Sequence, residues 1–125
     1  MHSARNPFSP DAFGLPSDPL TLLDMALTAA ITVGGIGHVL ITPLYYRHES
    51  GLNQAWFAGS GLALTFMGML NIARLRGEAT SEVFSKLANP AGALFLAVAA
   101  SQNRAPQTIA ASLLTTALAG LALRQ

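Results

Sequence analysis

The sequence predicts an all-α membrane bundle of four transmembrane helices. Charged residues make up 10% of the 125 residues, against about 25% in a typical soluble domain. A helix needs about 20 apolar residues to cross the core of a bilayer. In a soluble bundle the face opposite the apolar one would be charged, whereas here that face carries Gly, Ala, Ser and Thr. The long windows without a charged residue are 25–46, 52–73, 87–103 and 105–123.

The first span is predicted over 19–43. Asp18 is a favourable N-cap, and Pro19 is favoured at the first helical position because the N–H that it lacks would have no partner there. Pro43 cannot supply the N–H that a helix interior needs, and we expect it to end this span. The segment 1–18 is polar and rich in proline, which predicts an extended tail before a single domain.

The remaining spans follow in the same way and complete a transmembrane domain over 19–125. The second span is predicted over 54–73, and Gly77 follows it as a stop signal. The third is predicted over 81–101, with Pro90 expected to bend it. The fourth is predicted over 106–123, and it begins at a proline.

Lys and Arg are unequally shared between the two ends of the predicted bundle. An excess of these residues marks the cytoplasmic side of a membrane protein. We therefore expect both termini in the cytoplasm, with the chain in a bacterial-type inner membrane. The cations expected inside are Arg5, Arg74, Arg76, Lys86 and Arg124, and those expected outside are Arg47 and Arg104.

Composition excludes several functions. A net charge of +1 argues against nucleic-acid binding, which needs a basic surface. With no cysteine, disulfides and thiolate metal sites are impossible.

Helix geometry excludes a serine-hydrolase triad. Asp24 and His38 lie 14 residues apart on one helix, about 21 Å, so they cannot form a triad with Ser60. The sequence predicts no catalytic residue, no metal site and no bound cofactor, and the chain is not expected to be an enzyme.

A polar stripe follows the first predicted span. With 3.6 residues per turn, Asp24, Thr28, Thr32 and His38 fall on one face of the helix. Consecutive spans with a short loop are antiparallel neighbours, so this stripe is expected to meet polar residues of the second span. Polar residues are therefore expected at two depths in the membrane, an inner level and an outer level. The inner level holds Asp24, Asn71 and Asn89, and the outer level holds His38, Trp56 and Ser60.

Each of these groups has a structural and a functional interpretation. Asp24 lies only about 8 Å into its helix. Its carboxylate either reaches the interface and interacts with the helix dipole, or binds a proton or cation. His38 either hydrogen-bonds a neighbouring helix or titrates and binds a ligand. Asn71 and Asn89 are expected to donate hydrogen bonds between helices.

Small residues line several predicted helix faces. Helices in lipid associate where small side chains let their backbones approach closely. The residues expected at such contacts are Gly34, Gly35, Gly59, Ala63, Ala111, Thr115 and Ala119. These faces predict a tight bundle, and any that the bundle does not use could pack against a partner.

Three functions are compatible with this sequence. The first is a non-enzymatic accessory subunit that packs against a larger membrane complex or a second copy. The second is a small oligomeric transporter or channel that uses Asp24 and His38 as proton sites. In size, helix count and an acid in the first span, the chain is similar to small multidrug-resistance transporters, although its third span carries Phe95 and no Trp or Tyr. The third is binding of a lipid, quinone or pigment at the level of His38, Trp56 and Ser60.

Overall fold

The computed structural model describes residues 15–124, and every regular element among them is a helix. Each helix is long and apolar enough to cross a membrane. The predicted four-span fold is therefore confirmed, and it implies a lipid bilayer as the environment. Most of the predicted tail lies outside the described residues. The helices are α1 (Pro19–Tyr45), α2 (Gly51–Leu75), α3 (Ala79–Gln102) and α4 (Pro106–Arg124).

Asp18 caps α1 as predicted. Its carboxylate accepts hydrogen bonds from the Thr21 hydroxyl at 2.5 Å and the Thr21 backbone N–H at 3.0 Å. These bonds, the side-chain one first, hold the pKa of the Asp18 carboxyl below its ordinary value of 3.8. Helix α1 therefore begins at Pro19, directly after this N-cap.

The end of α1 and both ends of α2 differ from the predicted bounds by two or three residues. Helix α1 continues through Pro43 to Tyr45, because the proline falls in the last turn and disturbs only one intrahelical hydrogen bond. Helix α2 begins at Gly51, where the Ser50 hydroxyl accepts a hydrogen bond from a backbone N–H, and it extends through Arg74. Gly77, at φ 83°, ends the turn that follows.

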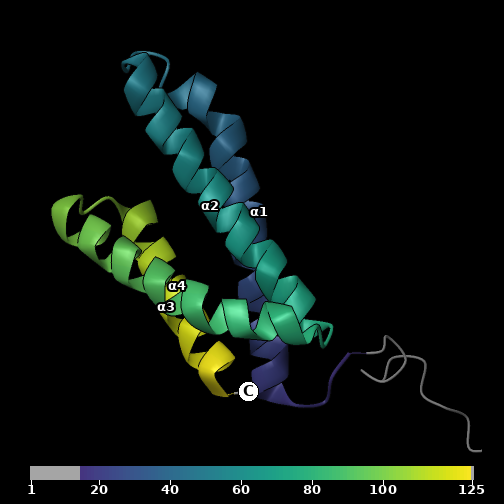
Figure 1. The fold of residues 1–125 in the computed structure, drawn as a ribbon. Coiled ribbons are helices and arrows are strands. Elements are labelled where there is room, and N and C mark those ends of the chain that lie inside the picture. Colours follow the sequence, from purple (N-terminus) through teal and green to yellow (C-terminus); the bar gives the residue numbers. More distant parts are fainter. Residues whose placement is uncertain (1–14, 125) are drawn as a thin grey trace, which may run out of the picture.

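The helices form two hairpins that diverge (Figure 1). Helices α1 and α2 lie side by side along their length, as do α3 and α4. Contacts between the hairpins join α2 to α3 and α1 to α4. The hairpins meet at the end that carries the α2–α3 turn and the C-terminus of α4, and they separate toward their other loops. We call these the closed end and the open end.

A small apolar core lies between the hairpins. Ile31 of α1, Met67 of α2 and Leu118 of α4 are buried against one another. Large apolar side chains elsewhere face outward, and Leu44 is 74% exposed. Outward-facing apolar residues are normal in lipid, where they are in contact with hydrocarbon.

Glycines bring α1 and α2 into close contact. A Cβ atom added to Gly35 would lie 2.6 Å from the backbone nitrogen of Thr65, and one added to Gly61 would lie 2.8 Å from Cγ2 of Val39. A Cβ atom added to Gly68 would lie closer still to the side chain of Thr32. The two helix backbones therefore approach more closely than any larger residue would allow.

The described helices use only some of the predicted small residues for packing within the bundle. Gly35 lies at a contact, but a Cβ atom on Gly34 or Gly59 would meet nothing within 4 Å. Gly34 is the neighbour of Gly35, and one step along a helix turns a residue by 100° to a different face. Ala63 is exposed, Ala111 is half-buried, and Thr115 and Ala119 are buried on α4.

A leucine at Gly35 should separate the first hairpin. The added side chain would overlap backbone atoms of α2, which cannot move away as a flexible side chain could. We expect Gly35→Leu to lower the free energy of unfolding by about 3 kcal/mol or more. Thermal unfolding in detergent measures this. Gly37→Leu is the control, since a Cβ there meets nothing within 4 Å, and equal stability of the two variants would contradict the packing.

Candidate functional site

A buried ion pair joins α1 to α2 at the closed end. The Arg74 guanidinium donates to the two carboxylate oxygens of Asp24 at 2.7 and 3.0 Å. Both side chains are 0% exposed. Two parallel N–H···O bonds are the strongest geometry available to this pair. The interfacial interpretation of Asp24 is therefore wrong, because its carboxylate faces an arginine inside the bundle.

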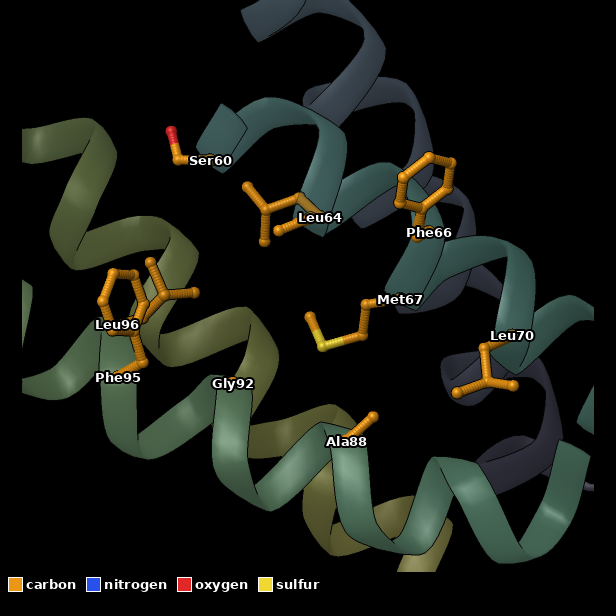
Figure 2. A pocket seen from close by; sticks show the side chains of 10 residues that line it. Ser60, Leu64, Phe66, Met67, Leu70, Ala88, Gly92, Phe95 and Leu96 are labelled. Atoms are coloured by element: carbon orange, nitrogen blue, oxygen red, sulfur yellow. The ribbon is translucent and has the colours of Figure 1, made fainter. Parts of the chain in front are cut away.

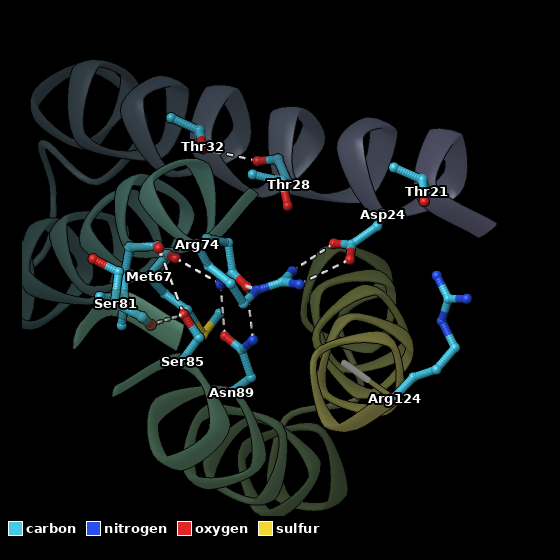
Figure 3. A network of polar contacts seen from close by, with 12 residues as sticks. Thr21, Asp24, Thr28, Thr32, Met67, Arg74, Ser81, Ser85, Asn89 and Arg124 are labelled. Atoms are coloured by element: carbon cyan, nitrogen blue, oxygen red, sulfur yellow. Dashed lines mark hydrogen bonds and ion pairs between the residues drawn. The ribbon is translucent and has the colours of Figure 1, made fainter. Parts of the chain in front are cut away.

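The ion pair continues into α3 through two asparagines (Figure 3). The Nε atom of Arg74 donates to the Asn71 carbonyl at 3.0 Å. Asn71 and Asn89 exchange hydrogen bonds of 2.7 and 2.8 Å, and Asn71 also donates to the Met67 backbone carbonyl at 2.8 Å. All four hydrogen-bonding positions of the Asn71 amide are thus used. We call Asp24, Arg74, Asn71 and Asn89 the polar clamp.

Sequence reasoning brought Asp24, Asn71 and Asn89 to one level but missed Arg74. A basic residue near the end of an apolar window is usually taken as the start of a loop. The available signal was the spacing of Asn71 and Arg74, which places them on one helix face. Thr28 lies one turn above Asp24, and its buried hydroxyl has no hydrogen-bond partner among the described residues. Thr32 donates to the Thr28 backbone carbonyl at 2.8 Å.

A cavity of about 480 Å³ lies between the hairpins toward the open end. All four helices contribute to its wall. Three of its aromatic side chains come from the first hairpin: Tyr46 follows α1, and Trp56 and Phe57 lie near the start of α2. Phe95 of α3 lines the side formed by the second hairpin. The cavity thus lies where the two hairpins separate.

His38 is one of several polar residues in this wall, which also include Ser60, Asn103, Gln107 and Thr108. Its Nε2 atom lies 3.2 Å from the Ser60 hydroxyl oxygen, and this hydroxyl donates to the Phe57 backbone carbonyl at 2.8 Å. The rings of Tyr46 and Phe57 stack with centroids 3.7 Å apart, and each centroid is 6.4 Å from that of His38. Trp56 lines the same cavity and is 71% exposed. His38, Trp56 and Ser60 therefore lie around one space.

A second cavity of about 330 Å³ extends between α2 and α3 (Figure 2). It shares Ser60, Leu64 and two residues of α3 with the first cavity, so the two spaces are neighbours. Beyond Ser60 its lining is apolar. The Met67 side chain points from α2 into this space, where Gly92 leaves room for its sulfur. The combined space has a polar side near His38 and an apolar extension toward the closed end.

The chemistry of this wall is that of a neutral binding site. None of the described residues that line the two cavities is Asp, Glu, Lys or Arg. Within residues 15–124, no group of three His, Cys, Asp or Glu side chains could hold a metal ion. No protein-family model, no curated protein and no solved structure matches this chain.

Removal of one charge from the polar clamp should destabilise the fold. Asp24→Asn takes away the anion opposite a buried guanidinium, which we expect to lower the free energy of unfolding by about 3 to 5 kcal/mol. The double change Asp24→Leu with Arg74→Met removes both charges and should restore most of the loss. Unfolding in detergent measures both.

The exposed ion pair of Asp18 and Arg124 supplies the control. It spans 3.5 Å, with side chains 50% and 40% exposed. Because such pairs contribute little, Arg124→Gln should leave the unfolding temperature almost unchanged. A similarly small effect of Asp24→Asn would show that the buried ion pair does not hold α1 and α2 together at the closed end.

Proposed function

We propose that this chain binds one amphiphilic molecule of the bilayer in the cavity between its hairpins and catalyses no reaction on it. The observation that carries this proposal is a cavity of about 480 Å³ with His38 and Ser60 on its wall and an apolar extension beside it. Ligand cavities typically measure about 300 to 1,000 Å³ and combine an apolar lining with a few polar groups. This is the lipid, quinone or pigment alternative among the three functions.

The divergence of the hairpins supports entry from the membrane. The cavity opens where α1 and α2 separate from α3 and α4. An amphiphile dissolved in the bilayer could move between the hairpins without crossing water. The polar clamp keeps the hairpins joined below this opening, so that the site exists before the ligand arrives and binding requires little reorganisation.

The distribution of Lys and Arg supports a proposal for the leaflet that contains the site. Arg74, Arg76, Lys86 and Arg124 belong to the closed end, and Arg47 and Arg104 to the open end. By the positive-inside rule we propose that the closed end and both termini are cytoplasmic. In a bacterial-type inner membrane the cavity would then serve the outer leaflet.

A leucine at Gly34 should block binding without unfolding the protein. Gly34 lines the cavity, and a Cβ there meets nothing within 4 Å, so the side chain would occupy the ligand's space. The probe is 4-dodecylphenol, followed through the emission of Trp56, which is the single tryptophan of the sequence. We expect Gly34→Leu to weaken binding at least tenfold and to leave the unfolding temperature unchanged.

The control for this variant is Gly37→Leu. Gly37 lies on the same helix and has the same open surroundings, but it does not line the cavity. Its probe affinity should equal that of the wild type. If the wild type does not bind the probe, or if Gly34→Leu binds it as well as the wild type does, the proposed function is overturned.

A second candidate function is assembly with a larger membrane complex or a second copy. The observation that favours it is the position of Ala55, Gly59 and Ala63, which have helical spacing on α2 and are all exposed. A Cβ on Gly59 would meet nothing within 4 Å, so Gly59 packs against no other helix of the described chain, while Ala63 also lines the smaller cavity. A helix of another protein could approach this row closely.

Gly59→Leu should test this candidate. A bulky residue would hold a partner helix away from the row, and we expect the complex seen on gentle solubilisation to be lost while the monomer stays folded. Native electrophoresis of the tagged protein measures the change, with Gly37→Leu as the control. An unchanged complex, or wild-type protein that migrates as a monomer, would remove this candidate.

Transport through Asp24 and His38 has less support. Asp24 is paired with Arg74 and does not line the cavity that contains His38. A proton path between the two would have to pass the apolar core.

A further inference from the structure

The hydrogen bonds of Ser60 determine the position of the proton on His38. A serine hydroxyl has one proton, and Ser60 donates it to the Phe57 backbone carbonyl at 2.8 Å. The contact of 3.2 Å between Ser60 Oγ and His38 Nε2 therefore needs its proton from the ring. The tautomer that satisfies both contacts of Ser60 is the one with its proton on Nε2, from which Ser60 then accepts.

The other ring nitrogen is then an acceptor. No acidic side chain lines the cavity to stabilise an imidazolium, and a neutral imidazole with a proton on Nε2 carries a lone pair on Nδ1. No described side chain donates a hydrogen bond to Nδ1. The ring lines the cavity, and a ligand that brings a proton of its own is the partner that this nitrogen would need.

The lining also limits the charge of the ligand. A phosphate or carboxylate head group would need a cationic partner, and an ammonium group would need an anion. Neither kind of side chain lines the cavity. Trp56 and Tyr46 carry N–H and O–H donors that any oxygen can accept from, and Asn103, Gln107 and Thr108 of the second hairpin can both donate and accept. The acceptor nitrogen of His38 adds a preference for a hydroxyl.

We infer that the ligand is an uncharged, hydroxylated amphiphile whose hydroxyl donates to Nδ1 of His38 and whose tail occupies the apolar cavity between α2 and α3. This inference rests on the proposed function and adds the chemical class of the ligand and its orientation in the cavity. Ser60 is a positioning residue, because it fixes the ring proton on the far nitrogen. A phenol, a quinol or a long-chain alcohol fits, and a phospholipid does not.

A matched series of probes tests the head group. Wild-type protein in detergent is titrated with 4-dodecylphenol, its methyl ether and its phosphate ester, with Trp56 emission as the readout. One hydrogen bond should make the phenol bind about tenfold more tightly than the ether. The phosphate should bind most weakly of the three.

Three variants test whether His38 and Ser60 cause the preference for the phenol over the ether. His38→Phe keeps a ring in the cavity but removes the acceptor, and its ratio of ether to phenol dissociation constants should fall to about one. Ser60→Ala leaves the imidazole in place and frees its proton to occupy either nitrogen, so that the ratio should fall below about threefold. His48→Phe, in the loop after α1, is the control and should keep the wild-type ratio. Because each ratio compares two probes in one protein, differences in folded fraction cancel. The unequal micelle partitioning of the two probes is the same for every variant, so it cancels when the ratios of two variants are compared.

The outcomes separate this inference from the proposed function. Wild-type protein that binds neither phenol nor ether overturns both. Equal affinity for phenol and ether, tightest binding of the phosphate, or a wild-type ratio in both His38→Phe and Ser60→Ala overturns the head-group assignment alone.

Discussion

The arrangement of the helices depends on the ion pair between Asp24 and Arg74. In hydrocarbon neither charge could be left without the other, so separation of α1 from α2 at this end would expose two ions to a medium of low dielectric constant. Asn71 and Asn89 extend the same constraint to α3. The described residues at the open end carry no comparable link between the hairpins. The position of the cavity follows from this difference between the two ends.

Each hairpin has a different part in forming the cavity. The close approach of α1 and α2 at Gly35 and Gly61 makes the first hairpin a single packed unit. His38 and Ser60 both belong to this unit, and their contact does not require the second hairpin. This contact is therefore independent of how far the hairpins separate, whereas Asn103, Gln107 and Thr108 bring further polar groups to the cavity from the second hairpin.

The sequence was sufficient for elements that depend on local chemistry and helical period. The four spans follow from charge-free windows, and the shared level of His38 and Ser60 follows from antiparallel neighbours joined by a short loop. Arg74 was missed because the sequence alone does not show whether a charged residue at the end of an apolar segment faces water or pairs with a buried residue. Its partner, Asp24, lies 50 residues earlier in the chain. Gly34 and Gly35 could not be assigned either, because which of two adjacent glycines meets α2 depends on the rotation of α1 about its axis.

The divergence of the hairpins also affects the surrounding lipid. A protein whose cross-section is larger at one end occupies more area in one leaflet than in the other. The lipids beside it must splay or tilt to fill the space next to the narrow end, and the strain is smallest where the membrane already curves toward that end. The shape set by the polar clamp thus gives the chain a preference for membrane curvature that a parallel-sided bundle of the same helices would not have.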